Sequence, residues 1–372
     1  MTKSLTKLWL RGLKSLMTNL PDGQDDYLRT MTKSPHPPPS DTEPATPRES
    51  RVRPRPAAWA KGQWVRSYHS APPQAGQLVN HLSYGLYLPP GKTARGLPLV
   101  VMLHGCKQTI DEFATGTRMN LVADENDFAV VYPEQSKHAH AHRCWHWYDD
   151  RDAAGRGEAH AVVSLVEALV DEYGFDGERV YLVGMSAGAG LAGLLALHYP
   201  ERFAAVGLHS GPALGEAHSG ITAMDVMRRG TRHDPIALID AATNMSAYPG
   251  MPAIIVHGEA DRVVVLKNAE QLALAFLRLN GFVDAMGAWR AGRTRETRDP
   301  GVVTHDHVME GRSLVRLCQV ADLEHAWSGG DEAMPFHSDK GPNASAMLWE
   351  FFRDQRRRRR PTAAERPAAA RH

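Results

Sequence analysis

The stretch that most constrains this chain is the pentapeptide Gly184-Met185-Ser186-Ala187-Gly188 with its flanks. The apolar run 180–183 before it predicts a buried strand, and residues 191–199, which end before a proline, predict a helix. So sharp a turn from strand to helix forces Ser186 into strained backbone angles, and the two glycines let strand and helix approach closely. We interpret this segment as a nucleophile elbow, which presents the Ser186 hydroxyl beside the free N–H groups of a helix amino terminus.

Both ends of the chain differ in composition from the middle. In residues 1–20, leucines recur at helical spacing with lysine and arginine on the other face, which predicts a cationic amphipathic helix. Residues 34–58 are dense in proline, serine and threonine, and five consecutive arginines begin at Arg356. We predict an amphipathic helix and proline-rich linker over 1–60, a catalytic domain over 61–355 and a basic disordered tail over 356–372.

Charge and cysteine content narrow the classes of function. The formal net charge of +1 gives no global field that would recruit nucleic acid. Three cysteines without C-x-x-C spacing are too few for a disulfide scaffold, although they allow one bridge.

No apolar run reaches the length of a membrane span, and the N-terminus lacks the apolar region and cleavage site of a signal peptide, which favours a cytoplasmic location. The helix of residues 1–20 either contacts a lipid or polymer-granule surface or docks on protein.

Strand and helix patterns alternate through the middle of the chain. Strands are predicted at 64–70, 82–88, 97–103, 128–132, 180–185, 203–208, 252–256 and 314–320. Helices are predicted at 113–124, 162–173, 191–199, 269–279 and 344–352, and residues 211–250 have room for a small cap. This alternation indicates an α/β class with a mostly parallel sheet and helices on both faces.

A serine nucleophile needs a histidine base, which is itself oriented by an acid. In folds built on such an elbow the chain order is serine, acid, histidine. The strand 252–256 runs into a polar turn that contains Asp261, our candidate acid; Glu259 in the same turn is its rival, and capping of the next helix is the alternative role for Asp261. His325, in the loop after the last core strand, is the candidate base among 19 histidines.

An oxyanion intermediate needs backbone N–H donors. One should come from Ala187, the residue after the nucleophile, and the other from the loop that follows an early strand. The strand 99–103 and its loop place Cys106 in that position. We discount a catalytic thiol at Cys106, because Ser186 already has an elbow. This chemistry requires no cofactor.

Six segments together resemble the poly(3-hydroxybutyrate) depolymerase-type esterases, a family of the α/β-hydrolase fold that is close to feruloyl and acetylxylan esterases. They are His104-Gly105-Cys106, Tyr132-Pro133-Glu134-Gln135, Arg143-Cys144-Trp145-His146-Trp147, Gly184-Met185-Ser186-Ala187-Gly188, His257-Gly258-Glu259-Ala260-Asp261 and His325-Ala326-Trp327-Ser328-Gly329-Gly330. The resemblance runs from about residue 82 to residue 352.

By position, the resemblance implies Ser186 as nucleophile, Asp261 as acid and His325 as base, with the backbones of Cys106 and Ala187 as oxyanion donors. It also implies that Cys106 and Cys144 lie near each other, so that they can be bridged. The resembled family is largely extracellular, in contrast to what the N-terminus favours. This sequence has His146 where the family has a polar amide and Glu324 where it has a small residue; the latter can alter the pKa of His325.

Two other groups of residues invite a functional reading. Five residues with metal-binding side chains occupy every second position of one segment, namely His138, His140, His142, Cys144 and His146. An extended backbone would place all five side chains on one side, with ligand atoms that suit zinc or copper. Such a row in a loop is usually solvated, so we predict no metal site. Trp145, Trp147 and Trp327 either form an apolar wall for an acyl chain or polymer, the substrate-binding role that we predict, or pack around the loops of the site.

The sequence therefore predicts a serine carboxylesterase that hydrolyses 3-hydroxyalkanoate esters, as oligomer or polymer, through an acyl-enzyme. Feruloyl or acetylxylan ester hydrolysis is the alternative within this class. A non-catalytic protein that binds a granule or surface is the alternative of another class. A peptidase of the same fold is disfavoured, because the chain has no room for a propeller or a large lid domain.

Overall fold

The computed structural model describes residues 60–73, 80–149 and 155–357. The helix predicted for residues 1–20, the linker at 34–58 and the tail beyond 357 lie outside the described residues, so the predicted domain boundaries stay predictions. None of the helices in the described ranges combines the length and hydropathy needed to cross a bilayer.

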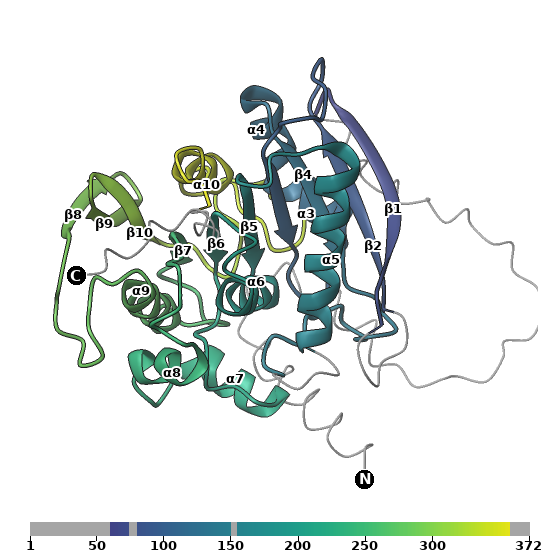
Figure 1. Cartoon of the computed structure of the whole chain (residues 1–372). Coiled ribbons are helices and arrows are strands. Elements are labelled where there is room, and N and C mark those ends of the chain that lie inside the picture. The colour runs from purple at the N-terminus through teal and green to yellow at the C-terminus, as the bar shows by residue number, and fades with distance from the viewer. Residues whose placement is uncertain (1–59, 74–79, 150–154, 358–372) are drawn as a thin grey trace, which may run out of the picture. The chain divides into compact units, whose positions relative to one another are not determined.

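A ten-stranded sheet organises the described part of the chain (Figure 1). Its order is β1-β2-β4-β3-β5-β6-β7-β10-β9-β8, and the strands from β4 to β10 in this order are parallel. The ranges are β1 Gln63–Ala71, β2 Asn80–Leu88, β3 Leu99–Leu103, β4 Ala129–Glu134, β5 Val180–Met185, β6 Ala205–His209, β7 Ala253–Gly258, β8 Arg293–Asp299, β9 Val302–Met309 and β10 Arg312–Val320. An antiparallel pair lies at each edge, β1 with β2 and β9 with β8.

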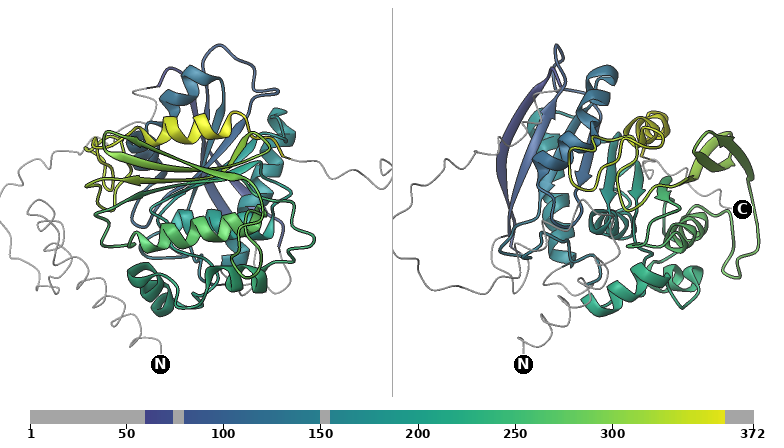
Figure 2. Two further views of the ribbon diagram at one scale, coloured as in Figure 1. Left: turned by 90° about the vertical axis from the view of Figure 1, so that its left-hand side faces the viewer. Right: turned by 180° about the vertical axis from the view of Figure 1, so that it is seen from behind.

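Helices cover both faces of this sheet, which confirms the predicted layers (Figure 2). Helices α5, α6 and α9 pack on one face, with α7 and α8 beyond α9, and α3, α4 and α10 pack on the other. Their ranges are α3 Ile110–Thr117, α4 Met119–Asn126, α5 Gly155–Tyr173, α6 Ala187–His198, α7 Gly220–Arg229, α8 Pro235–Ala242, α9 Lys267–Leu279 and α10 Ala344–Phe352.

The central strands are apolar on both sides because both of their faces are covered. All residues of β3, β5, β6 and β7 are buried. Aromatic rings fill the layer between the sheet and α10, where Tyr181 stacks on Phe352 with ring centroids 4.9 Å apart. Burial of such rings is worth roughly 2–3 kcal/mol each, so this layer holds the strands in register.

Three features differ from the sequence prediction. The helix predicted at 113–124 is two helices, because Arg118 adopts a left-handed conformation with φ of 55° and breaks the run. The cap region at 211–250 contains α7 and α8. Strands β8 and β9 were not predicted, and all seven residues of β8 are exposed, so β8 lacks the apolar alternation on which a strand prediction depends.

Candidate active site

Ser186 lies at the turn between β5 and α6 with φ of 55° and ψ of −119°. Few non-glycine residues adopt such angles, and strain of this kind costs about 1–3 kcal/mol. The flanking glycines explain how it is tolerated: a Cβ on Gly184 would lie 2.1 Å from the carbonyl oxygen of Gly188, and one on Gly188 would lie 2.1 Å from that of Leu103. The backbone N–H of Ser186 donates to the carbonyl of His209 at 3.0 Å, which holds the turn.

Three loops at the carboxyl edge of the sheet bring Ser186, Asp261 and His325 into one hydrogen-bonded chain. The Nε2 atom of His325 lies 3.0 Å from Ser186 Oγ, and its Nδ1 atom lies 2.7 Å from Asp261 Oδ2. A carboxylate only accepts hydrogen bonds, so Nδ1 holds the proton and Nε2 is left to accept from the serine hydroxyl. This arrangement has the geometry of a nucleophile, a base and an orienting acid.

Asp261 is fixed from its other side by its own turn. Its Oδ1 atom accepts from the backbone N–H groups of Val263 and Val264, both at 2.9 Å. Burial opposes ionisation of this carboxyl, but the charge and hydrogen bond of His325 outweigh it and lower the pKa of Asp261. Asp261 is therefore ionised at neutral pH. Its rival in the sequence, Glu259, is exposed.

The loop after β3 lies against the nucleophile. A Cβ on Gly105 would lie 3.4 Å from Ser186 Cβ, and the N–H of Gly105 donates to Gln108 Oε1 at 2.8 Å. Within the described ranges, the N–H groups of Cys106 and Ala187 have no internal acceptor. The first N–H groups of a helix point outward from its amino end, and Ala187 begins α6. Both donors are available to a developing oxyanion beside Ser186.

The buried side chain of His104 holds the loop after β3 through two hydrogen bonds to the backbone. Its Nε2 atom accepts from the N–H of Gln135 at 3.0 Å, and its Nδ1 atom donates to the carbonyl of Gly105 at 2.7 Å. Burial lowers the pKa of His104 to about 4. The imidazole is thus neutral at neutral pH and retains the acceptor that its contact with Gln135 requires. This role of His104 was not predicted from the sequence.

A disulfide joins Cys106 to Cys144 and so links the loop after β3, which we call the oxyanion loop, to the loop after β4. The backbone supports the same connection, since the N–H of Lys107 donates to the carbonyl of His142 at 2.6 Å. The pairing that the family resemblance implied is therefore present. The third cysteine, Cys318, is free and buried.

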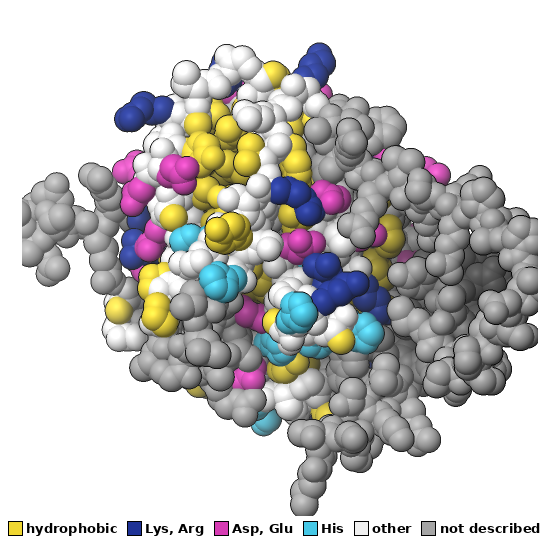
Figure 3. Space-filling model, turned by 90° about the vertical axis from the view of Figure 1, so that its right-hand side faces the viewer, with side chains coloured by type: hydrophobic (Ala, Val, Ile, Leu, Met, Phe, Trp, Pro, Cys, Tyr) yellow, Lys and Arg dark blue, Asp and Glu magenta, His cyan; other side chains and the backbone are white. Residues whose placement is uncertain are grey.

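The alternating histidines do not form an extended row. The loop turns at His140, whose carbonyl accepts from the N–H of Arg143, and Cys144 is in the disulfide. No group of three or more histidine, cysteine or acidic side chains in the described residues could hold a metal. Figure 3 shows the surface on the side of β1, where histidine, lysine and arginine side chains lie close together in one area.

The two departures from the family pattern have different surroundings. His146 Nδ1 lies 2.6 Å from Glu158 Oε1, and this hydrogen bond raises the pKa of His146 despite its partial burial. Glu324 is exposed.

The prediction that three tryptophans line a substrate wall is wrong for Trp145 and Trp327, which are 1% and 0% exposed. The Nε1 of Trp145 donates to the carbonyl of His104 at 3.0 Å, and the ring of Trp327 stacks on His209. Trp147 is also buried, and its ring fills the space beside Gly190. Their packing supports the loops of the site instead of exposing apolar surface.

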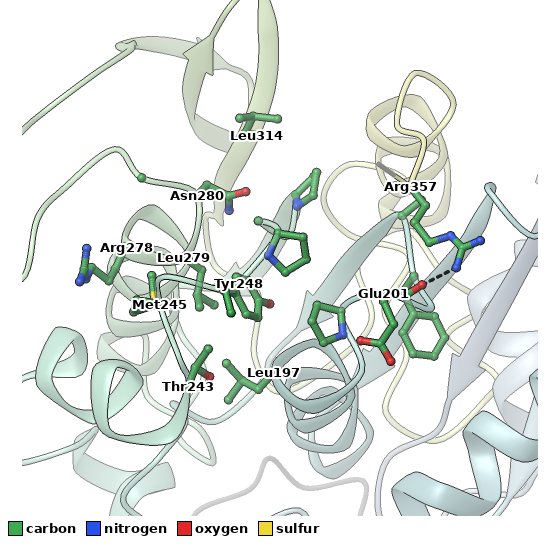
Figure 4. Close-up of a pocket in the computed structure, with 18 of the residues that line it drawn as sticks. Leu197, Glu201, Thr243, Met245, Tyr248, Arg278, Leu279, Asn280, Leu314 and Arg357 are labelled. Atoms are coloured by element: carbon green, nitrogen blue, oxygen red, sulfur yellow. Dashed lines mark hydrogen bonds between the residues drawn. The ribbon is translucent and has the colours of Figure 1, made fainter. Parts of the chain in front are cut away.

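A groove of about 870 Å³ lies at the opposite, amino edge of the sheet (Figure 4). It is lined by residues that precede β6 and β7, by the end of α9 and by the turn before β10, among them Leu197, Tyr248, Arg278 and Asn280. None of Ser186, Asp261 and His325 lines it. The volume of a cavity therefore does not indicate the site in this molecule.

The chain is similar in sequence to known esterases. A family model described as "Esterase PHB depolymerase" matches residues 82–300. The chain is 32% identical to poly(3-hydroxyalkanoate) depolymerase C of Paucimonas lemoignei over 200 residues, which cover 52% of this chain and 48% of the relative. It is 31% identical to feruloyl esterase B of Neurospora crassa over 188 residues, which cover 47% of this chain and 62% of the relative. The chain spans about half the length of the curated relatives it matches.

Among solved structures, an acetyl xylan esterase from Aspergillus awamori superimposes with a TM-score of 0.57 at 18% identity, covering 77% of this chain and 98% of the other. At this identity the likeness concerns the fold, and it confirms the predicted α/β-hydrolase architecture. Because the family model matches more than half of the sequence, the chain belongs to the PHB depolymerase-type esterase family.

Proposed function

We propose that this chain is a serine carboxylesterase with Ser186 as nucleophile, His325 as base and Asp261 as orienting acid. The observation that carries the proposal is the hydrogen-bonded chain from Ser186 Oγ through His325 to Asp261. Family membership supports the same chemistry. A strained serine beside unoccupied helix N–H groups has little use in a protein that does no acyl transfer.

In the first half of the reaction, His325 Nε2 takes the proton of Ser186 as Oγ attacks the ester carbonyl. The Asp261 carboxylate stabilises the imidazolium that results. The N–H groups of Cys106 and Ala187 donate to the oxyanion of the tetrahedral intermediate. Collapse of this intermediate breaks the ester bond, and the alcohol leaves with the proton that His325 held.

In the second half, water replaces the alcohol. His325 Nε2 takes a proton from water as its oxygen attacks the acyl-enzyme carbonyl, and the same two N–H groups stabilise the second oxyanion. The intermediate then collapses to release the carboxylic acid, and Ser186 regains its proton from His325.

For the substrate, we propose 3-hydroxyalkanoate esters, as oligomer or polymer. The support is the family model and the relative from Paucimonas lemoignei, named as a poly(3-hydroxyalkanoate) depolymerase. A feruloyl or acetyl ester of the plant cell wall is the second candidate, supported by the relative from Neurospora crassa, named as a feruloyl esterase.

The chemistry is tested with p-nitrophenyl butyrate. Ser186→Ala should lower kcat by at least about 10⁴-fold, while the melting temperature stays close to that of the wild type because the turn keeps its glycines. Retained turnover in this variant would overturn the role of Ser186. Covalent labelling of the wild type at Ser186 by a fluorophosphonate probe separates the enzyme from a non-catalytic granule-binding protein, in which this serine is inert.

The substrate is tested by comparing kcat/KM for release of 3-hydroxybutyrate from a linear trimer, ferulate from methyl ferulate and acetate from acetylated xylan. We expect the hydroxybutyrate trimer to be preferred by at least about tenfold, equivalent to about 1.4 kcal/mol in transition-state binding. A preference for ferulate or acetate would replace the proposed substrate and leave the proposed chemistry intact.

A further inference from the structure

His209 ends β6 directly beneath the site and is fully buried. It lies between two other strand ends, since it pairs with Met185 on one side and with Val256 on the other. Its carbonyl oxygen accepts the N–H of Ser186 at 3.0 Å. The backbone of this residue therefore holds the strained turn that presents the nucleophile.

The side chain of His209 reaches a different loop. Its Nε2 atom accepts the backbone N–H of Ser328 at 3.2 Å, and its ring stacks on Trp327 with centroids 4.7 Å apart and planes 19° apart. These two residues follow His325 closely in the sequence. The Nδ1 atom lies 3.1 Å from Ser210 Oγ and donates to it, because Nε2 acts as the acceptor.

The surroundings keep this imidazole neutral. Burial lowers the pKa of His209 well below its ordinary value, and protonation of His257, His325 or His337 would lower it further, against the opposing charge of Asp261. Nε2 therefore remains an acceptor across the neutral pH range. Protonation would remove the only lone pair that can receive the N–H of Ser328.

We propose that His209 is a positioning residue for the esterase reaction proposed above. Its backbone fixes the turn of Ser186, and its imidazole fixes the loop of His325, so one rigid residue sets the distance between Ser186 Oγ and His325 Nε2. His209 touches no reacting atom and acts only through these two loops. An error of 1 Å in such a distance can lower a rate by about 100-fold.

The test compares His209→Phe with His209→Gln in p-nitrophenyl butyrate hydrolysis. Phenylalanine keeps a ring against Trp327 but has no acceptor, and glutamine returns an acceptor near the position of Nε2. We expect His209→Phe to lower kcat by about 10- to 100-fold, the range that follows from one lost buried hydrogen bond, with KM within about twofold of the wild type. His209→Gln should recover most of this loss.

Tyr132→Phe is the matched control for stability. Its hydroxyl is equally buried and donates to Asn120 Oδ1 at 2.7 Å, a hydrogen bond that involves neither the elbow nor the loop of His325. This variant should lower the melting temperature and leave kcat unchanged. If His209→Phe lowers kcat no more than Tyr132→Phe does, His209 is merely structural and the inference is overturned.

Two further results separate the possible failures. If His209→Phe does not fold, His209→Met is used in its place, because methionine matches glutamine in length and lacks a strong hydrogen-bond acceptor. Equal kcat values of His209→Met and His209→Gln would then overturn the inference. A wild type that neither hydrolyses esters nor reacts with a fluorophosphonate overturns the proposed function itself. An active wild type with unaffected His209 variants overturns only the positioning role.

Discussion

The two ends of the parallel strands are built differently. At the carboxyl end, Ser186 combines φ of 55° with ψ of −119°, whereas at the amino end the positive φ of Glu310, 51°, belongs to the tight turn between β9 and β10. At the amino end lies the groove of about 870 Å³, where two of the polar side chains in the lining bind the protein itself. Tyr248 donates to the carbonyl of Ala196 at 2.7 Å, and Arg278 forms a bidentate pair with Asp240.

The comparison shows which features distinguish a reactive site from a groove on the protein surface. The amino end offers space, but Tyr248 and Arg278 in its lining are engaged with the protein itself. The carboxyl end accepts strained backbone, which costs stability, and in return directs a hydroxyl, an imidazole and two N–H groups at one point. The convergence of these groups at a strained serine therefore marks the candidate site, and Ser186, Asp261 and His325 do not line the groove.

The largest expected effect lies at the carboxyl end. Asp261→Asn removes the charge that orients His325 and allows the wrong tautomer, so kcat for p-nitrophenyl butyrate should fall about 10⁴-fold. Glu259→Gln, in the same turn but exposed, should stay within about twofold of the wild type. A small effect of Asp261→Asn, or a large one of Glu259→Gln, would reassign the acid.

Alanine substitution of one glycine at each end of the strands compares how strongly the two ends resist an added Cβ. Gly188→Ala places a Cβ 2.1 Å from the carbonyl of Leu103 and should cost more than about 4 kcal/mol in the free energy of unfolding, or prevent folding. Gly281→Ala, in the lining of the groove, meets no atom within 4 Å and bears only the strain of φ at 78°, so it should cost about 1–2 kcal/mol. Urea denaturation measures both, and equal costs would contradict the comparison.

Cys144→Ser cuts the tether between the oxyanion loop and the loop after β4. We expect the free energy of unfolding to fall by about 2–4 kcal/mol, and kcat to fall by about tenfold because Cys106 loses its fixed position. Reduction of the wild type with dithiothreitol should have the same effect, whereas the variant should not respond to it. A wild type that keeps its full kcat after reduction would show that the backbone alone holds the donor.

The smallest effect concerns pH. The raised pKa of His146 means that its stabilisation is fully present below the unfolded pKa of about 6.5 and is lost as pH rises through the folded pKa. His146→Asn should therefore lower the melting temperature more at pH 6 than at pH 8, by a contribution under about 1 kcal/mol. Tyr248→Phe in the groove should cost about 1 kcal/mol equally at both pH values. Equal losses at both pH values in His146→Asn would contradict this assignment.

The sequence was sufficient for the features that depend on local patterns. Buried strands such as β3 and β5 are continuous apolar runs, and the elbow has glycines at the only positions that permit it. Chain order then indicated Asp261 and His325, which the structure brings together with Ser186. These predictions rest on short segments whose geometry is determined by adjacent residues.

Long-range packing was beyond the sequence. Nothing local distinguishes a tryptophan that lines a surface from one that stacks beneath it, so the substrate-binding role predicted for Trp327 was wrong. For the same reason His209 passed unnoticed: its contact with Ser328 spans 119 residues. The hairpin of β8 and β9 escaped prediction because an exposed, charged edge has no apolar periodicity.

The exposed edge strand β8 has a consequence for how copies of this protein meet. An edge strand offers unpaired N–H and C=O groups to any other strand, and a sheet of ten strands would be an effective template for aggregation. The sequence of β8 is Arg-Thr-Arg-Glu-Thr-Arg-Asp. A second chain pairing there would have to desolvate three arginines and two acidic side chains without apolar burial in return. Beta-strand addition at this edge is therefore disfavoured, and the hairpin protects the central strands from intermolecular pairing.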